Sequence, residues 1–173
     1  YDLSKLILDR NYSLDEINEL ENKFQLNNPF FNNKDFLKAK NLLIKIIKKK
    51  ELVLVYGDYD VDGVCSTAIL VNFLNYIKNP NYYLIPNRFN DGYGPNLDLI
   101  KRKLKKNTKI VIFVDCGSNS AKIINFLKKN NIEVLIIDHH HINNKLPSTL
   151  NIINPMKNSK DYTGQNILSL IHI

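Results

Sequence analysis

The chain has 173 residues, of which 44% are hydrophobic and 24% are charged, with six Gly and six Pro. This length suits one domain, and the composition excludes collagen-like, mucin-like and disordered chains. The most apolar stretch, residues 68–77, is interrupted by Asn72 and Asn75 and is shorter than the ~20 residues of a membrane helix. The sequence starts without Met and without an export signal, so we expect it to begin inside a longer reading frame.

The net charge of +7 comes almost entirely from Lys, because Arg stands only at positions 10, 88 and 102. Two explanations are open: a polyanionic partner such as nucleic acid, or the codon bias of an AT-rich genome. The two cysteines, Cys65 and Cys116, lie far apart and lack the pair spacing of a metal site. They argue against a disulfide scaffold, are expected to be small buried residues beside the site, and fit a reducing cytoplasm.

Residues 1–50 are predicted to form a helical extension that packs on the core. Ser13 followed by Glu16 is a capping-box pattern that opens a helix running to about Gln25, and Pro29 follows its end. A second helix begins at about Asp35, where apolar residues recur at intervals of three and four. These residues are Phe36, Ala39, Leu42, Leu43, Ile46 and Ile47.

From residue 51 onward, short apolar runs alternate with segments of helical length. The runs cover residues 52–56, 82–85, 110–114 and 132–137, with a fifth at 150–153, and the helical segments are about 63–77, 95–105 and 119–130. Continuous apolar runs indicate strands covered on both faces. The pattern predicts an α/β fold with a doubly wound, mainly parallel sheet over residues 51–155, followed by a tail at 156–173.

A polar segment follows each of the first four strands, at residues 57–63, 86–94, 115–118 and 138–141. Ligands bind at the carboxyl ends of the strands in such sheets, so we expect all four segments to meet at one edge. Five acidic residues lie in these segments next to the strands: Asp58, Asp60, Asp62, Asp115 and Asp138.

Five carboxylates in one crevice would raise one another's pKa unless a multivalent cation compensated their charge. Oxygen ligands together with imidazole from His139 and His140 suit Mn²⁺ or Mg²⁺, with Fe²⁺ or Zn²⁺ as alternatives. Two such cations, about 3.5–4 Å apart, would lower the pKa of a bridging water and neutralise a phosphoryl group. The sequence therefore predicts a metal site for phosphoryl chemistry.

Other interpretations of these segments are open. Asp-x-Asp-x-Asp also begins an EF-hand loop, but the twelfth position counted from Asp58 is Ile69 instead of Glu. The His pair could be a solvated turn, and we expect His141 to lie at the surface. Arg88 lies in a Gly-rich loop with Tyr93, where it could hold a phosphate or pair with a nearby carboxylate.

The segments 57–63, 114–117 and 138–140, in this order, resemble the DHH phosphoesterase superfamily. Within it, Pro86-Asn87-Arg88, the glycines around Tyr93 and the Asn154-Pro155 pair resemble the RecJ family of bacterial single-stranded-DNA-specific exonucleases. The resemblance implies a two-metal exonuclease, using Mn²⁺ or Mg²⁺, that acts 5′-to-3′ on single-stranded DNA in recombination and repair. It also implies a helicase and a single-strand-binding protein as partners, and no membrane.

Residue roles carry over by motif. Asp60, Asp62, Asp115 and His139 match the metal ligands, and with His140, a ligand or a partner of the scissile phosphate, they form the expected catalytic set. Asp58 and Asp138 are placed as further acids at the metals. Arg88, Tyr93 and His140 are expected to bind substrate.

The chain departs from the family pattern after the His pair. A further metal-binding Asp, a second domain and an OB module are expected there and do not occur in this sequence, and residues 163–173 do not continue the expected Gly-rich helix. In the N-terminal segment, Asn11 stands where the family usually has Gly. We therefore expect a fragment that binds metal weakly and has little exonuclease activity. The alternatives are an enzyme for short oligonucleotides, cyclic dinucleotides or pyrophosphate, and a non-catalytic binding module.

Overall fold

The computed structural model describes residues 33–92, 94–142 and 151–157, and they form an α/β fold around one parallel sheet. The strands are β1 (Leu52–Gly57), β2 (Asn81–Leu84), β3 (Thr108–Val114), β4 (Glu133–Ile137) and β5 (Ile152–Ile153). Their order in the sheet is β2-β1-β3-β4-β5, and every neighbouring pair is parallel. The predicted parallel sheet and its strand positions are confirmed.

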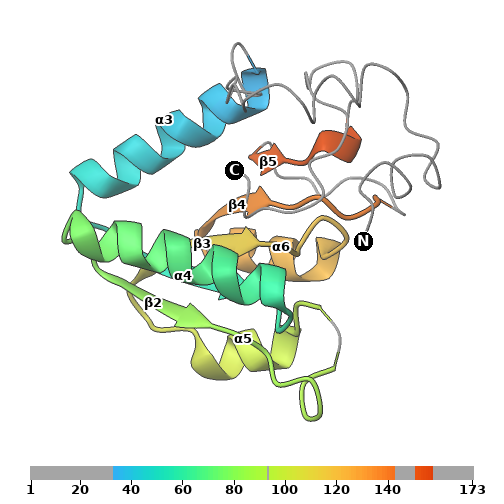
Figure 1. Ribbon diagram of the computed structural model, residues 1–173. Coiled ribbons are helices and arrows are strands. Elements are labelled where there is room, and N and C mark those ends of the chain that lie inside the picture. Colours follow the sequence, from blue (N-terminus) through green and yellow to red (C-terminus); the bar gives the residue numbers. More distant parts are fainter. Residues whose placement is uncertain (1–32, 93, 143–150, 158–173) are drawn as a thin grey trace, which may run out of the picture.

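Helices cover both faces of the sheet (Figure 1). They are α3 (Lys34–Lys48), α4 (Val61–Tyr76), α5 (Leu97–Lys103) and α6 (Ala121–Lys129), and a 3₁₀ turn spans Pro155–Lys157. Side chains alternate along β1, so that Val53 and Val55 join the core under α3 and α4, whereas Leu54 and Tyr56 join the core under α5 and α6. Burial on both faces explains why the strands appear in the sequence as continuous apolar runs.

Polar caps set where the helices begin. The side chain of Asn33 accepts a hydrogen bond from Phe36 N at 2.9 Å, and that of Asn96 accepts one from Leu99 N at 2.9 Å. At α4 the cap is Asp60, so the helix starts two residues earlier than predicted. Because Asp62 and the residues after it are already helical, the EF-hand interpretation is excluded. The helix predicted at 13–25 lies outside the described residues.

The order of the strands creates a crevice at one edge. Strands β2 and β3 flank β1, so the chain leaves β1 toward one side of the sheet and leaves β3 toward the other. A divergence of this kind is the usual ligand-binding position in doubly wound sheets. In the part of the chain that the structure describes, no helix is long and apolar enough to cross a bilayer.

Candidate metal centre

Three carboxylates follow β1. Asp58 is 3% exposed, and its Oδ1 accepts a hydrogen bond from Tyr59 N at 2.7 Å. Asp60 caps α4 by accepting from Gly63 N at 2.9 Å, and Asp62 lies in the first turn of the same helix. The positive end of the helix dipole favours negative charge at these positions. The helix start therefore holds a cluster of acids at the crevice.

Asp115, directly after β3, is the most unusual member of the site. Its backbone has φ of 60°, a left-handed conformation that few residues other than Gly, Asn and Asp adopt. The side chain is 1% exposed, and neither carboxylate oxygen has a hydrogen-bond partner among the described residues. Burial, together with the charges of Asp62 and Asp60, raises its pKa to about 8. A carboxylate that is buried without donors either keeps its proton or is stabilised in its ionised form by a bound cation.

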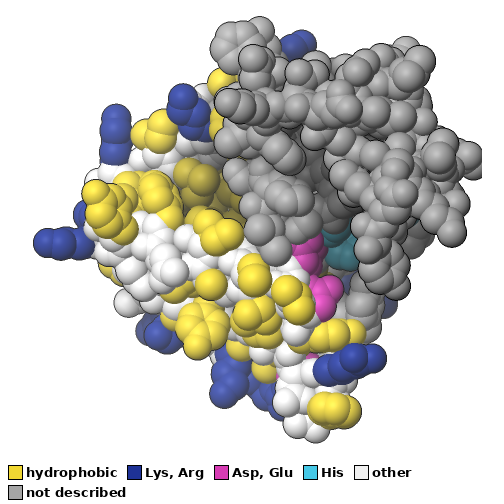
Figure 2. Space-filling model, in the orientation of Figure 1, with side chains coloured by type: hydrophobic (Ala, Val, Ile, Leu, Met, Phe, Trp, Pro, Cys, Tyr) yellow, Lys and Arg dark blue, Asp and Glu magenta, His cyan; other side chains and the backbone are white. Residues whose placement is uncertain are grey.

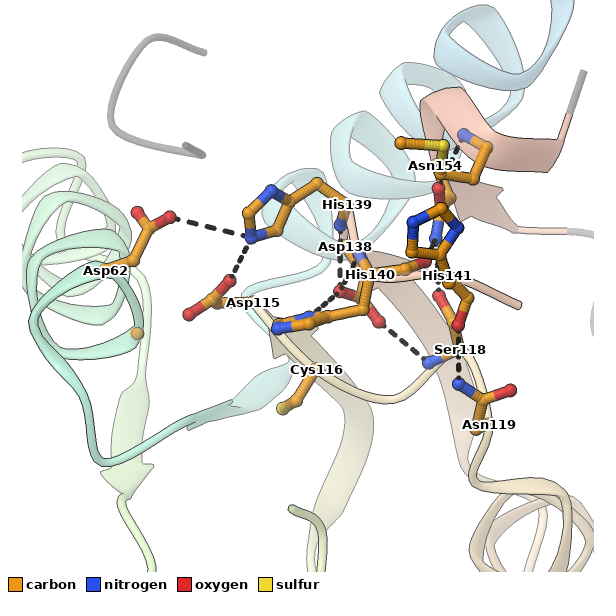
Figure 3. Close-up of polar contacts among 12 residues, drawn as sticks. Asp62, Asp115, Cys116, Ser118, Asn119, Asp138, His139, His140, His141 and Asn154 are labelled. Atoms are coloured by element: carbon orange, nitrogen blue, oxygen red, sulfur yellow. Dashed lines mark hydrogen bonds and ion pairs between the residues drawn. The ribbon is translucent and has the colours of Figure 1, made fainter. Parts of the chain in front are cut away.

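His139, from the segment after β4, points at these acids (Figure 3). Its Nε2 lies 2.9 Å from Oδ1 of Asp115, without the alignment of a hydrogen bond, and 3.7 Å from Oδ2 of Asp62. Ligand atoms of Asp115, His139 and His140 all lie within 4.8 Å of one another. Oxygen and imidazole donors from three separate chain segments therefore converge, and this donor set fits Mn²⁺ or a similar divalent ion.

Asp138 differs from the other acids because both of its oxygens already have donors. Oδ1 accepts from the backbone N–H groups of His139 and His140 and contacts Nδ1 of His140 at 2.8 Å, whereas Oδ2 accepts from Ser118 N at 3.0 Å. Burial alone would raise the pKa of Asp138, but the bonds from His140 and Ser118 outweigh it and lower the pKa. In turn, the hydrogen bond with Asp138 raises the pKa of His140 to about 9. This geometry leaves Asp138 suited to orienting the His pair.

Sequence analysis missed two residues that support this pair. Asn154, which is fully buried after β5, donates to Ser118 Oγ at 2.9 Å and to the backbone carbonyl of His140 at 3.0 Å. Its own Oδ1 accepts from Met156 N at 2.8 Å. In the sequence the Asn154-Pro155 pair indicates only a family resemblance, and nothing local marks Ser118. These contacts connect the ends of β3, β4 and β5 at the crevice.

We expect Asn154→Ala to lower the free energy of unfolding by about 1–3 kcal/mol, because it leaves buried partners unsatisfied. The His pair should also lose its fixed position, so the change in melting temperature caused by Mn²⁺ should shrink. Thermal unfolding with and without Mn²⁺ measures both effects. Ser118→Ala serves as a graded comparison, because it removes one of the three side-chain bonds of Asn154. Equal metal responses in the parent and both variants would contradict the supporting role.

A pocket of about 280 Å³ opens beside the cluster. Its walls include Asp58, Asp115, Asp138 and His140, together with Gly94 and Ser120. Figure 2 shows carboxylates and a histidine side by side at the surface near the start of α4. The pocket thus lets a small anionic group reach the acids and the imidazole of His140.

Arg88 was predicted to bind substrate and does not line the pocket. Its guanidinium is exposed and lies 5.6 Å from the centre of the ring of Tyr59, which stands between Asp58 and Asp60 in the sequence, while Asp91 pairs with Arg102 at 3.5 Å. Arg88 is therefore near the site without a carboxylate partner among the described residues. Tyr93 lies outside the described residues.

The predictions for the two cysteines and for His141 can be compared with the structure. Cys116 is buried in the pocket wall, and burial raises the pKa of its thiol well above the ordinary value, whereas Cys65 is only half-buried. His141 is exposed as predicted, and its carbonyl accepts from Asn119 at 2.9 Å. We assign no catalytic or binding role to these three side chains.

Taken together, the doubly wound sheet and its acidic, histidine-bearing crevice define an α/β domain with a candidate metal centre. The centre lies at the edge where the connections after β1 and β3 diverge. The sequence model of the N-terminal domain of the DHH family matches residues 52–172. The chain belongs to the DHH family, which confirms the resemblance.

Several solved and curated proteins are similar. The single-stranded-DNA-specific exonuclease RecJ of Haemophilus influenzae is 36% identical over 118 residues, which are 68% of this chain and 20% of the relative. A crystal structure of exonuclease RecJ bound to manganese has a TM-score of 0.65 and 31% identity, over 70% of this chain and 31% of the other. RecJ of Thermus thermophilus in complex with Mn²⁺ has a TM-score of 0.60 and 27% identity, over 72% and 17%. The chain thus spans less than a third of each of these three proteins.

Proposed function

We propose that this chain carries the metal centre of a nuclease that hydrolyses phosphodiester bonds of single-stranded DNA from the 5′ end. The observation that carries the proposal is Asp115, a buried carboxylate whose oxygens have no donor among the described residues and which has His139 at 2.9 Å. The similarity to single-stranded-DNA-specific exonucleases, including structures that contain manganese, supports the choice of substrate and of Mn²⁺ or Mg²⁺.

Asp60, Asp62, Asp115 and His139 would hold the cation, with Asp58 available to a second one. When bound, such cations activate water and offset the charge on a phosphate. Oδ2 of Asp60 is the oxygen most accessible to a cation, because Oδ1 already accepts from Gly63 N. Asp138 serves the site indirectly, by fixing His140, because its own oxygens are occupied.

The remaining groups bind and orient substrate. In the metal-free chain the hydrogen bond with Asp138 raises the pKa of His140 to about 9, and its other ring nitrogen, Nε2, can donate to a phosphate oxygen in the pocket. Arg88 is exposed beside the ring of Tyr59, where it can contact a phosphate of the strand. A pocket of about 280 Å³ is small for ligand sites, which span ~300–1,000 Å³, so it suits a single phosphate group with its sugar.

The wider biological role is part of the same proposal. Repair and recombination, with a helicase and a single-strand-binding protein as partners, would follow if the whole protein acts as its relatives are named. The family match covers residues 52–172, which supports a DHH domain that starts at about residue 51 and extends past the expected end at 155.

The proposal is tested by metal binding first and turnover second. At a Mn²⁺ concentration of about 100 Kd, binding stabilises the folded chain by ~2.7 kcal/mol, which raises the melting temperature by about 5–10 °C at this size. Asp62→Asn should remove most of this shift. The absence of a shift in the parent, or the same shift in both proteins, would contradict the metal centre.

Turnover is measured with enzyme in excess, so that slow hydrolysis is visible. We expect slow, Mn²⁺-dependent release of mononucleotides from long single-stranded DNA, and slower cleavage of a dinucleotide or pyrophosphate. Faster cleavage of either small substrate would favour the other branches of the family. Asp62→Asn is the blank for contaminating nuclease.

A further inference from the structure

The edge of the sheet opposite the metal centre is crowded with lysine. Because all strands are parallel, the segments that precede β1, β2, β3 and β4 lie at one edge, which we call the amino edge. Nine exposed lysines lie there: Lys48, Lys49, Lys50, Lys78, Lys103, Lys105, Lys106, Lys109 and Lys129. Two acidic residues, Glu51 and Glu133, accompany them. Nine lysines against two acidic residues give this edge a surplus of seven positive charges.

Codon bias alone would spread lysines evenly, yet nine of the 17 lysines among the described residues lie at this one edge. Figure 2 shows several Lys or Arg side chains along the left and lower margins and others at the top and lower right, while the visible carboxylates lie to the right. Strands β1 and β3 have six and seven residues, so at about 3.3 Å per residue the two edges are ~20 Å apart. This separation exceeds the Debye length of about 8–10 Å, so each edge acts on a ligand by itself.

Helix dipoles explain only part of the lysine excess. Helices α3, α4, α5 and α6 all end at the amino edge, and each end carries about −0.5 charge, or ~−2 in total. Lys50 serves such an end directly, because its Nζ donates to the carbonyls of Ile77 and Lys78 at 2.8 and 3.0 Å. None of the nine lysines is paired with a carboxylate of the described residues. Most of the positive charge is therefore available to a partner.

An exposed aromatic ring lies in the same place. Tyr76, the last residue of α4, is 86% exposed and directly precedes the two carbonyls that Lys50 binds. An exposed ring among lysines is the combination by which proteins hold single strands, since bases stack on the ring while lysines contact phosphates. An acidic polypeptide would use the lysines and leave the ring without a function.

We propose that the amino edge is a second binding surface for single-stranded nucleic acid, independent of the metal centre. The choice of nucleic acid among polyanions rests on the proposed function. The surface would hold a part of the strand that is not being cleaved, about 20 Å from the crevice. The binding needs no metal, which separates it from the chemistry at the other edge.

The test is fluorescence anisotropy of a labelled oligothymidine with the 173-residue chain in EDTA, at several salt concentrations. The variant is Lys105→Gln/Lys106→Gln/Lys109→Gln. The matched control is Lys34→Gln/Lys38→Gln/Lys40→Gln, which removes the same charge from exposed positions in the first two turns of α3, away from the amino edge. Thermal unfolding verifies that both variants are folded.

We expect the amino-edge variant to bind the oligothymidine about tenfold more weakly at low salt. The slope of log affinity against log salt should flatten by about 2, because each of the three lost phosphate contacts contributes ~0.7 on a single strand. The control should change by less than about twofold. Tyr76→Ala should weaken binding at least about fivefold, because stacking is lost.

Three results would overturn the proposal: no binding by the parent, equal losses in the variant and the control, or tighter binding of a polyglutamate peptide than of DNA at the amino edge. The last would assign the edge to an acidic polypeptide. Because the assay contains no metal, a failed hydrolysis experiment leaves its result unchanged, and a failure here leaves the metal centre in place.

Discussion

Replacing Asp115 by asparagine is expected to abolish the Mn²⁺ response and nuclease activity while making the metal-free chain more stable. The loss of activity should exceed the roughly 10–100-fold that outer partners of a metal cost, because Asp115 is proposed to contact the cation directly. Asparagine is a suitable replacement, since it has nearly the same shape and tolerates the φ of 60° at this position.

The gain in stability follows from the raised pKa. The carboxyl titrates at about 8 in the folded chain and near ~3.9 when unfolded, so the folded state binds the extra proton between these values. Metal-free parent protein therefore loses stability as pH rises from about 4 to 8 and levels off above 8. The variant has no such proton, so its advantage should grow across this window, to about 2 kcal/mol or ~4–8 °C at pH 9.

Thermal unfolding in EDTA at pH 5, 7 and 9 measures this difference. Asp98→Asn is the control, because the Asp98 side chain is 86% exposed and the chemical change is the same. Its effect should stay below about 1 kcal/mol at every pH. Parallel stability curves for the parent and Asp115→Asn would show that the carboxylate is not strained by its burial.

Gly63→Ala should have the largest effect on the fold. Helix propensity alone predicts a gain of about 1 kcal/mol for alanine inside a helix. Here a Cβ would lie 2.6 Å from the backbone N and O of Asp58, and these atoms cannot move as a side chain can. Overpacking costs about 1–3 kcal/mol or more, so we expect a net loss of ~2–3 kcal/mol. The Asp58 backbone must also shift, which should weaken Mn²⁺ binding.

Urea unfolding and the Mn²⁺-induced change in melting temperature measure the two effects. Asn72→Ala, at an exposed position of the same helix, is the matched control and should gain a few tenths of a kcal/mol. If Gly63→Ala were as stable as this control, the close approach of α4 to the loop after β1 would be wrong.

Most of the fold could be predicted because the sheet is buried on both faces. Four continuous apolar runs marked β1 to β4, and periodic apolar residues marked α3. The predicted start of α4 was less accurate, since the helix was expected from Gly63 and begins at Val61, after the Asp60 cap. The convergence of the strand ends followed from the parallel order alone, so the amino-acid sequence was sufficient to place the acids and the His pair together.

The finer geometry could not be predicted, because it depends on contacts between distant segments. Nothing local shows that Asp138 is fully hydrogen-bonded while Asp115 lacks donors among the described residues, although both directly follow buried strands. Likewise, the link from Asn154 to Ser118 joins residues 36 positions apart. The amino edge could not be predicted for a related reason. Its lysines lie in four separate segments, before β1, β2, β3 and β4, and only the fold brings these segments to one edge.

The link through Asn154 also bears on how the chain folds. Ser118, His140 and Asn154 follow three different strands, so their contacts form only after β3, β4 and β5 have taken their places. Contacts between remote segments require costly loop closure and tend to form late. Partly folded forms should therefore lack affinity for manganese, and the rate at which a refolding sample acquires the ion would report arrival at the native state.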